Sequence, residues 1–386
     1  MDRLIFDEEH EMFRDSVRSF MINEVQPHGE KWREQGIVDR EAYLKAGEQG
    51  LLLMWADEKY GGAGVADFRY EQILMEELTR HGEPGFFLWL HSRLVGPYIE
   101  EFGTAEQKQR WLPKCVSGES ILAIAMTEPG AGSDLASIRA KAEDKGDHFL
   151  LNGAKTYISN GILADLVIVA ARTDPESRRG ISLFVVERGM EGFERGANLA
   201  KMGLKSQDTA ELFFNNVKVP KENLLGELHR GFYHMMHGLV EERLLAAVGF
   251  VANAEAAFAV TMDYVRERHA FGQPIAAFQN TRFKMADMRT EIDVAQAFVD
   301  QCVLQHNAGK LSAEDAAKAK LFTSELEGRV TDECLQLHGG AGYMDEYPIS
   351  RMYTAARVSR IYAGSSEIMR EIIARSIGLD PRKAGA

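Results

Sequence analysis

The stretch that decides the fold is His148-Phe149-Leu150-Leu151-Asn152-Gly153-Ala154-Lys155-Thr156-Tyr157-Ile158-Ser159. Branched and aromatic residues occupy both halves of this segment, and the Asn152-Gly153 pair between them is the strongest short signal for a β-hairpin turn. Further short runs of this kind follow at 166–170, 181–186 and 210–214, separated by turn residues. We therefore expect a small antiparallel β-barrel or sandwich over residues 121–232.

Residues 1–120, before this β region, show the period of helices. Apolar side chains recur at three- and four-residue steps after Asp7, Asp39 and Asp67, and each aspartate can cap the helix that follows it. Thr104 and Gln107 have the spacing of a capping box in front of another helix. An N-terminal helical domain is therefore expected.

The helical period returns after Phe232. The segments 241–268, 276–307 and 312–338 have no internal break and are longer than the usual helix of about eleven residues. Long amphipathic helices usually form bundles or oligomer interfaces. The predicted fold class is α+β, with an N-terminal α-helical domain at 1–120, a central β domain at 121–232 and a C-terminal four-helix bundle at 233–386.

The composition is that of a folded globular protein with an acidic charge balance. Of 386 residues, 45 are Lys or Arg and 58 are Asp or Glu, so the net charge is −13, and 45% of the residues are hydrophobic. Nucleic acids and anionic membranes need a basic protein surface, so neither is expected as a main partner. A phosphorylated small molecule needs only a local cluster of arginines and remains compatible with this balance.

The cysteines and the apolar windows bear on the cellular compartment. Cys115, Cys302 and Cys334 are odd in number and widely spaced, which favours a reducing compartment over a disulfide framework. Residues 1–9 are acidic, unlike a secretory signal or a transit peptide, and the most apolar window, 162–171, is about half as long as a membrane span. We expect a cytoplasmic protein without a membrane span.

Five segments contain residues suited to ligand binding or catalysis. Gly130 and Gly132 let backbone amides approach a ligand, and Thr127 and Ser133 add hydroxyl donors, although an ordinary loop explains this composition equally well. Residues 339–342 follow the end of a predicted helix and include three glycines, whereas a helix C-cap needs only one. The five segments are Met126–Asp134, Arg268–Pro274 with Gln279, Gln336–Tyr343, Arg360–Ile368 and Glu241–Leu244.

Simpler explanations exist for several of these residues. Arg268 near a helix end is most often a cation that compensates the helix dipole. Acids and a base side by side at 241–243 are most often a solvated helix face. His234 and His237 do not match any recognised ligand spacing, so no metal site is predicted.

Taken in order, the five segments resemble the acyl-CoA dehydrogenases, flavoenzymes that oxidise acyl-CoA thioesters at the Cα–Cβ bond. The similarity extends from the first predicted helix to Ile377, and Met126–Asp134 and Gln336–Gly342 are its most specific parts. The segments 201–211 and 344–349 are most similar to the long-chain type.

The resemblance implies an FAD-dependent enzyme of fatty acid β-oxidation. FAD is expected without a covalent bond, in a homotetramer built as a dimer of dimers, with electron-transferring flavoprotein as the electron acceptor. Arg268, Gln279 and the segment 336–340 are implied to reach FAD across the subunit interface. The implied cofactor residues are Ile124, Met126, Thr127, Gly132, Ser133, Tyr157, Ile158, Ser159, Arg268, Phe271, Gln279, Gln336, Leu337, His338, Gly339, Gly340, Ser365, Ser366 and Glu367.

The resemblance also assigns the catalytic base. The reaction removes an α-proton while the β-hydrogen leaves as hydride to flavin N5, and the product is the trans-2-enoyl-CoA. Many members place the base where this chain has Ala363, whereas the long-chain and isovaleryl types place it on a helix, directly before an arginine. The matching residue here is Glu242 before Arg243, and the backbone N–H of Ala363 is expected to hydrogen-bond the thioester oxygen.

The substrate residues follow from the same resemblance. Arg178 and Arg179 are expected to meet the phosphates of CoA, and the others line the acyl-CoA site. The implied set is Ser133, Tyr233, Val240, Glu241, Arg243, Ala363, Gly364, Arg178 and Arg179.

Substrate and reaction type stay open within this fold. Straight long-chain, 2- or 3-methyl-branched and terpenoid acyl-CoAs are all compatible with the resemblance. Ile124 and Tyr157 differ from the residues that some relatives place beside the flavin, so the packing there is expected to differ. An acyl-CoA oxidase or flavin monooxygenase of the same fold is one alternative. A non-catalytic CoA-binding or scaffold protein is the alternative from another class.

Overall fold

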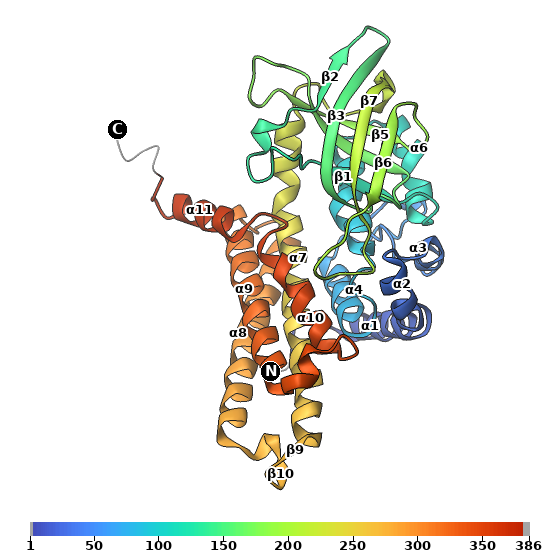
Figure 1. The fold of residues 1–386 in the computed structure, drawn as a ribbon. Coiled ribbons are helices and arrows are strands. Elements are labelled where there is room, and N and C mark those ends of the chain that lie inside the picture. Colours follow the sequence, from blue (N-terminus) through green and yellow to red (C-terminus); the bar gives the residue numbers. More distant parts are fainter. Residues whose placement is uncertain (1–2, 381–386) are drawn as a thin grey trace.

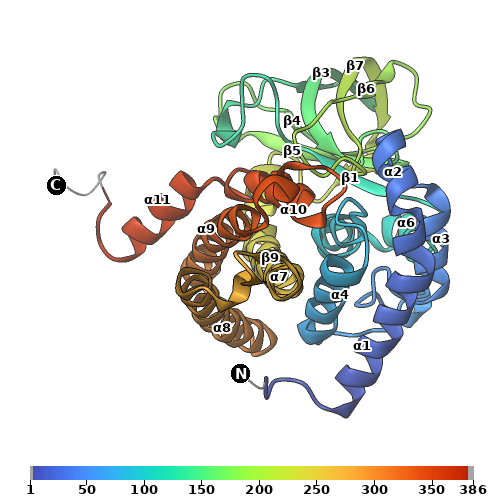
Figure 2. The same cartoon turned by 60° about the horizontal axis from the view of Figure 1, so that its bottom comes forward.

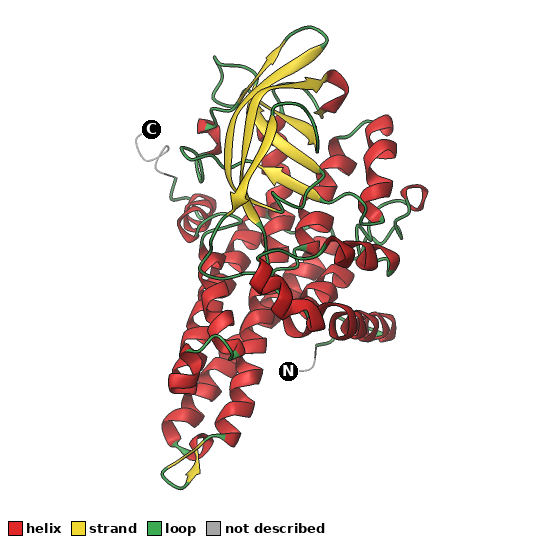
Figure 3. Ribbon diagram, turned by 45° about the vertical axis from the view of Figure 1, so that its right-hand side comes forward, coloured by secondary structure: helices red, strands yellow, loops and turns green. Residues whose placement is uncertain are grey.

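The computed structural model describes residues 3–380, which form helices, then a sheet, then long helices along the chain (Figure 1). Figure 3 shows the strands of the large sheet gathered at one end of the molecule, a small pair of strands at the opposite tip, and helices between them. The predicted order of a helical region, a β region and a second helical region is therefore confirmed.

Capping residues begin several N-terminal helices where the sequence predicts them. Asp7 and Thr104 each close a capping box, and Asp67 accepts a backbone N–H in the first turn of its helix. Asp39 stands at the predicted cap position, but its carboxylate binds Lys31 at 2.6 Å and caps no backbone N–H. The helices are α1 (Glu8–Phe20), α2 (Gly29–Gln35), α3 (Arg40–Glu48), α4 (Phe68–His81), α5 (Gly96–Phe102) and α6 (Ala105–Val116).

The central region is one eight-stranded mixed sheet in the order β6-β7-β3-β2-β4-β5-β8, with β1 paired to β4. β1 is parallel to β4, so the predicted antiparallel arrangement is wrong here; the chain between them crosses over through β2 and β3. Within residues 3–380 no pairing joins β6 to β8, and the sheet does not close into a barrel. The strands are β1 (Leu122–Ala125), β2 (Lys141–Asp144), β3 (His148–Ser159), β4 (Leu166–Arg172), β5 (Ile181–Glu187), β6 (Phe193–Asn198), β7 (Thr209–Pro220) and β8 (Leu224–Leu225).

The Asn152-Gly153 pair does not form the predicted hairpin turn. β3 continues through it, with a bulge between Leu151 and Gly153. Gly153 has a φ of +144°, and a Cβ on it would lie 2.6 Å from that of Ala140. The glycine thus permits the close approach of Ala140, just before β2. The extra residue of the bulge stands on β7, between Phe214 and Val217. The chain reverses between β2 and β3, around Gly146.

The C-terminal region is helical, as predicted, but only three of its helices are long. These are α7 (Gly231–Glu267), α8 (Gln279–Asn307) and α9 (Ala313–His338), and α7 lies between α4 and the pair α8 and α9 (Figure 2). The short α10 (Pro348–Ala356) packs on α9 and α7, and α11 (Ser366–Ser376) packs on α9. The fourth member of the predicted bundle is therefore one short helix. A small hairpin of β9 (His269–Ala270) and β10 (Gln273–Pro274) joins α7 to α8 at the far tip.

α7 is the central helix of the molecule. One 18-residue window of it is apolar enough, by length and composition, to cross a membrane, and 78% of that window is buried inside the protein. Such burial is typical of a core helix. α7 thus contains a longer apolar stretch than the ten-residue window 162–171, and most of that shorter window is the buried strand β4. Cys115, Cys302 and Cys334 are buried free thiols.

Candidate functional site

The glycine-rich loop 126–134 follows β1 and is attached to β3 by a buried ion pair. Lys155 Nζ donates to the carbonyl oxygen of Met126 at 3.0 Å and to Glu128 Oε1 at 2.8 Å, and the Lys155 side chain is fully buried. Burial lowers the pKa of Lys155 to about 8, against the attraction of Glu128, which favours the charged form. The Thr156 N–H donates to the Thr127 carbonyl at 3.0 Å. The loop therefore has a defined conformation beside the end of β3.

Glu128 is tied to the backbone on its other side. Its two carboxylate oxygens accept from the N–H groups of Arg139 and Ala140 at 2.7 and 2.9 Å. Bonds from charged groups of this kind are the strong ones in proteins. Glu128 thus joins the loop, β3 and the chain entering β2.

Tyr157, Ile158 and Ser159 are brought beside this loop by β3, as the resemblance implies. Tyr157 has a φ of +58°, which is rare for a residue with a Cβ, and its ring is 70% exposed. A Cβ on Gly130 or Gly132 would meet no atom within 4 Å, so their backbone is open to a ligand. An exposed aromatic face beside an open glycine backbone fits a flat ring with a phosphate-bearing tail, such as FAD.

Glu242 lies on α7 with its side chain in the protein interior. It is 7% exposed, and its Oε1 accepts a hydrogen bond from the Tyr98 hydroxyl at 3.2 Å. Burial raises the pKa of Glu242 to about 7, and the Glu241 charge raises it further, while the Tyr98 hydroxyl and Arg243 lower it. A carboxylate with this pKa is suited to general base catalysis near neutral pH.

A cavity of about 300 Å³ adjoins Glu242 between α7 and α5. Arg93 and His306 lie on its wall and both bind Glu241, with Nε–Oε1 at 2.8 Å and Nε2–Oε2 at 2.9 Å respectively. Glu241 is therefore an ion-paired wall residue of the cavity. The other lining residues are Leu94, Pro97, Tyr98, Glu101, Phe102, His237, Gly238, Val240, Gly309 and Leu311.

Arg243 is also buried, at 6% exposure, and its Nε has no hydrogen-bond partner among the described residues. Burial lowers the pKa of Arg243, while Glu242 raises it. The simpler explanation of 241–243 as a solvated helix face is therefore wrong, because the acid and base at 242 and 243 point into the protein.

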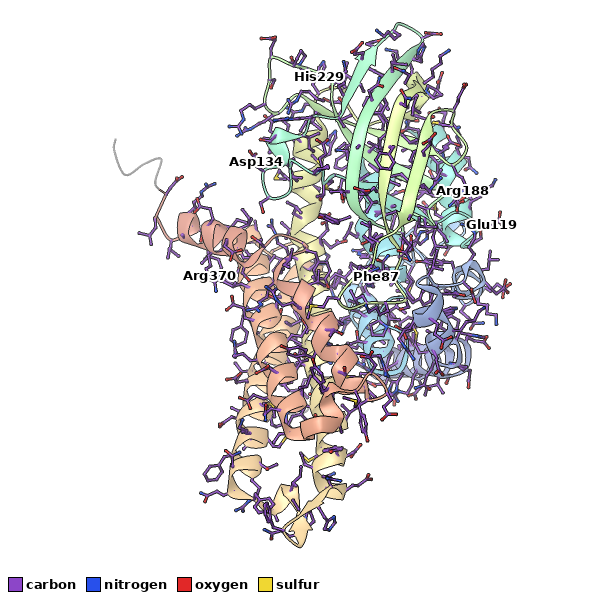
Figure 4. All side chains as sticks on the ribbon, in the orientation of Figure 1. Phe87, Glu119, Asp134, Arg188, His229 and Arg370 are labelled. Atoms are coloured by element: carbon purple, nitrogen blue, oxygen red, sulfur yellow. The ribbon has the colours of Figure 1, made fainter. Side chains whose placement is uncertain are left out.

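The candidate CoA-phosphate arginines lie near the glycine-rich loop and the start of α7. Arg178 Nη2 is 3.2 Å from Asp134 Oδ2, at the end of the loop, and both side chains are largely exposed. The Arg179 guanidinium lies 6.0 Å from the centre of the Tyr233 ring, so these two predicted substrate residues are neighbours. Asp134 lies on the same side of the molecule as Arg370 of α11 (Figure 4).

A second group of predicted cofactor residues lies at the other end of α7. Arg268 caps the C-terminus of α7, and Gln279 begins α8. The Tyr264 hydroxyl donates to the His338 carbonyl at 3.1 Å, which places the end of α9 beside the end of α7. Phe271 is 95% exposed at the tip, and Gly339 and Gly340 have open space where a Cβ would be. Leu337 packs partly buried against the core beside Gln336.

The predicted cofactor residues of the chain therefore lie in three places. Residues 242 and 267 of α7 are about 38 Å apart along the helix axis, at about 1.5 Å per residue. The glycine-rich loop is near the first end, and Arg268 with the segment 336–340 is at the second. The third predicted group, at 365–367, begins α11, where Ser365 accepts from the Ile368 N–H as its cap. Ser366 is buried and Glu367 is exposed.

His234 and His237 do not share a ligand. The His234 ring packs on Phe102 with centroids 4.0 Å apart, whereas His237 pairs with Glu101 at 3.3 Å. In the part of the chain that the structure describes, no group of three His, Cys, Asp or Glu residues is placed to hold a metal ion.

Tyr98, Glu128 and Lys155 are site residues that the sequence reasoning missed. A signal for Lys155 was present, because alternation along β3 puts it on the same face as the buried Phe149 and Leu151. A lysine at an inward position needs a carboxylate or carbonyl partner. Tyr98 had no such signal, since its contact with Glu242 joins residues far apart in the chain.

Three models of known families match consecutive parts of the chain: the acyl-CoA dehydrogenase N-terminal domain over 7–119, the middle domain over 123–217 and the C-terminal domain over 229–378. The chain is 48% identical over 381 residues to the mitochondrial long-chain specific acyl-CoA dehydrogenase of Mus musculus, covering 98% of this chain and 88% of that protein. It is 38% identical to the mitochondrial isovaleryl-CoA dehydrogenase of Solanum tuberosum, covering 97% and 92%.

Solved structures agree with this match. An acyl-CoA dehydrogenase from Geobacillus kaustophilus superposes with a TM-score of 0.96 at 50% identity, covering 98% of this chain and 100% of that one. An acyl-CoA dehydrogenase from Bacillus anthracis complexed with FAD has a TM-score of 0.91 at 34% identity, covering 96% and 67%.

Proposed function

The chain belongs to the acyl-CoA dehydrogenase family, and from this premise we propose that it catalyses the FAD-dependent α,β-dehydrogenation of a long-chain or methyl-branched acyl-CoA. The observation that supports this most directly is the buried Glu242 carboxyl, with its pKa near 7 and a cavity beside it. The product is the trans-2-enoyl-CoA.

Glu242 is the proposed general base. In its ionised form it takes the α-proton of the thioester, and the dry surroundings of its carboxyl make it a stronger base than an exposed glutamate. The Tyr98 hydroxyl orients the carboxylate through Oε1. That contact leaves Oε2 of Glu242 for the proton.

The proposed FAD site combines the exposed Tyr157 ring, the open backbone of Gly130 and Gly132, and the start of α11. FAD, when bound, supplies the acceptor of the β-hydride. The group formed by Arg268, Phe271, Gln279 and residues 336–340 is then proposed to contact the FAD of a neighbouring subunit in a homotetramer. Electron-transferring flavoprotein is the proposed acceptor of the electrons.

The substrate is proposed to bind along the start of α7. Its CoA phosphates meet Arg178 and Arg179 near Tyr233, and its acyl chain enters the cavity beside Val240 and Glu242. The small side chain of Ala363 leaves room for a methyl branch near Cβ. We further propose that the protein acts in the cytoplasm, where its three free thiols stay reduced.

The test is anaerobic flavin bleaching by a panel of acyl-CoAs that differ in chain length and branching. Glu242→Gln is expected to keep FAD and to lose bleaching, because the amide cannot accept the α-proton. Glu255→Gln, on the same helix but in a partly exposed ion pair with Arg289 outside the cavity lining, is the matched control and should bleach at the native rate. Bleaching of Glu242→Gln at the native rate would show that another group is the base.

A further inference from the structure

The turn at residues 361–365 has a strained backbone and a free amide at Ala363. Ala363 has a φ of +53°, a left-handed conformation that residues with a Cβ seldom adopt, and Gly364 follows at +92°. The N–H groups of Ile361 and Tyr362 donate to the Val358 carbonyl at 2.8 and 3.1 Å. Across residues 3–380, by contrast, the Ala363 N–H has no protein acceptor. The turn thus presents this amide to a ligand.

Lys320 of α9 anchors the other side of this turn. Its Nζ donates to the carbonyl oxygen of Gly364 at 2.6 Å, and its side chain is fully buried. A buried ammonium persists only where it is bound, so this contact is specific. Only the backbone dihedrals of Ala363 and Gly364 lie between the anchored carbonyl and the free amide.

The same lysine is a neighbour of the proposed catalytic helix. Burial lowers the pKa of Lys320, and the charge of Arg243, directly after Glu242, lowers it further. The carboxylates of Glu327, Glu367 and Glu325 act in the opposite direction and raise it. The Tyr362 ring also packs on Phe250 of α7, with centroids 5.8 Å apart. The turn is therefore held against α7 and α9 together.

We propose that Lys320 is a positioning residue for the dehydrogenation, because its bond to the Gly364 carbonyl fixes the direction of the Ala363 N–H toward the thioester oxygen. This inference rests on the proposed function. A donor aimed at the oxygen where negative charge develops contributes typically ~100- to ~1000-fold to the rate. Lys320 acts on that donor through the backbone and touches no reacting atom.

The first variant to make is Lys320→Met, which keeps the length of the side chain and removes the donor. We expect kcat to fall roughly 10- to 100-fold, a part of what losing the donor itself costs, with little change in the KM for acyl-CoA or in FAD content. Lys318→Met, two residues away on α9 and paired with Glu314 at the surface, should behave as the native enzyme. Lys320→Gln, which is too short to reach Gly364, serves as the second variant if methionine prevents folding.

Two further measurements separate positioning from a role in folding alone. An enoyl-CoA whose double bond is conjugated to an aromatic ring should absorb at longer wavelength when bound to the native holoenzyme, because its carbonyl is polarised, and at shorter wavelength in the Lys320 variants. Amide exchange of the holoenzyme should be faster at residues 361–365 in the variants. A lower melting temperature with native kcat and native absorption shift would overturn the proposal.

Failure of the proposed function is distinguishable from failure of this inference. If no acyl-CoA of the panel bleaches the flavin of the native protein, the proposed function is wrong, whatever the Lys320 variants show. If the native protein bleaches, and the Lys320 variants keep the native kcat, absorption shift and exchange rate, only the role of Lys320 is wrong.

Discussion

The hydroxyl of Tyr98 lies 3.2 Å from Oε1 of Glu242, and this hydrogen bond joins α5 to α7 across 144 positions of the chain. Both side chains are buried. Burial disfavours the ionised form of Glu242, whereas the hydroxyl stabilises it. Tyr98 therefore helps to set the pH at which Glu242 can accept a proton.

Tyr98→Phe is expected to raise the pKa of Glu242 above its value of about 7, because the phenyl ring cannot stabilise the carboxylate. The base must be ionised, so the acidic limb of kcat/KM against pH should move to higher pH. Measurement of kcat/KM for both proteins from about pH 5.5 to 9, a range around the native Glu242 pKa of about 7, tests this shift. A limb that stays in place would show that the hydroxyl does not act on the carboxylate.

Glu241→Gln should shift the same limb in the opposite direction. The charge of Glu241 raises the pKa of Glu242, so its removal makes Glu242 easier to ionise. Glutamine keeps the size of the side chain beside Arg93 and His306. The comparison of the two variants is sharper than either alone, because a general disturbance of the cavity would move both limbs the same way.

Lys155→Met should destabilise the glycine-rich loop and weaken FAD binding. Removing one partner of a buried ion pair leaves the other charge unpaired and costs about 3–5 kcal/mol. Unfolding in urea and the FAD retained after gel filtration measure the two effects. Lys141→Met is the matched control, because the Lys141–Glu143 pair is exposed and such pairs contribute about 1 kcal/mol or less. Equal losses in both variants would contradict a special role for Lys155.

The stability of the protein should fall between pH 5 and pH 8, the range over which buried Glu327 is forced to ionise. Burial raises the pKa of Glu327 from 4.5 to about 8, so the folded state binds more protons than the unfolded state between these values. Glu327 therefore lowers the free energy of unfolding by roughly 1.4 kcal/mol per pH unit over this range. Above the pKa of the folded state, it causes no further loss. Glu71, raised to about 7 by burial, acts in the same direction.

Glu327→Gln removes the contribution of one of these groups and should flatten the curve. Glutamine can still accept the hydrogen bond that Asn253 Nδ2 donates at 2.6 Å. Buried His91 acts in the opposite direction below pH 6.5, because burial lowers its pKa to about 4 and protons then favour the unfolded state. Unfolding free energies of the two proteins at pH 5, 6.5 and 8 test the slope. An identical slope in both would exclude Glu327 as its source.

Local patterns predicted the helices well and the sheet less well. Asp7 and Thr104 cap helices through neighbours in sequence, so their caps were readable. The Asn152-Gly153 pair is a turn signal that β3 overrides, because pairing with β7 continues on both sides of Gly153, while β2 pairs with β3 up to Asn152. Only the position of neighbouring strands decides between a turn and a bulge, and that position is set by distant residues.

The candidate site likewise contains residues that the sequence identified and residues whose role depends on contacts with distant parts of the chain. Glu242 was identified from its place before Arg243, through a resemblance, while its residue type alone favoured a solvated helix face. Its burial depends on α5 packing against α7, and the partner Tyr98 is far away in sequence. Lys320 was missed because it bonds to a backbone carbonyl, which leaves no trace in residue identity. Lys155 was missed although its inward position in β3 indicated a buried partner.

The length of α7 has a genetic consequence. Glu242 and Arg268 lie far apart along α7. In the proposed homotetramer, each catalytic unit would therefore use Glu242 of one chain and Arg268 of another. Two alleles, one damaged at Glu242 and the other at Arg268, would then complement each other. A mixed dimer of the two products has one unit with both defects and one with neither. Activity regained on refolding the two inactive proteins together, and absent when each refolds alone, would reveal that exchange.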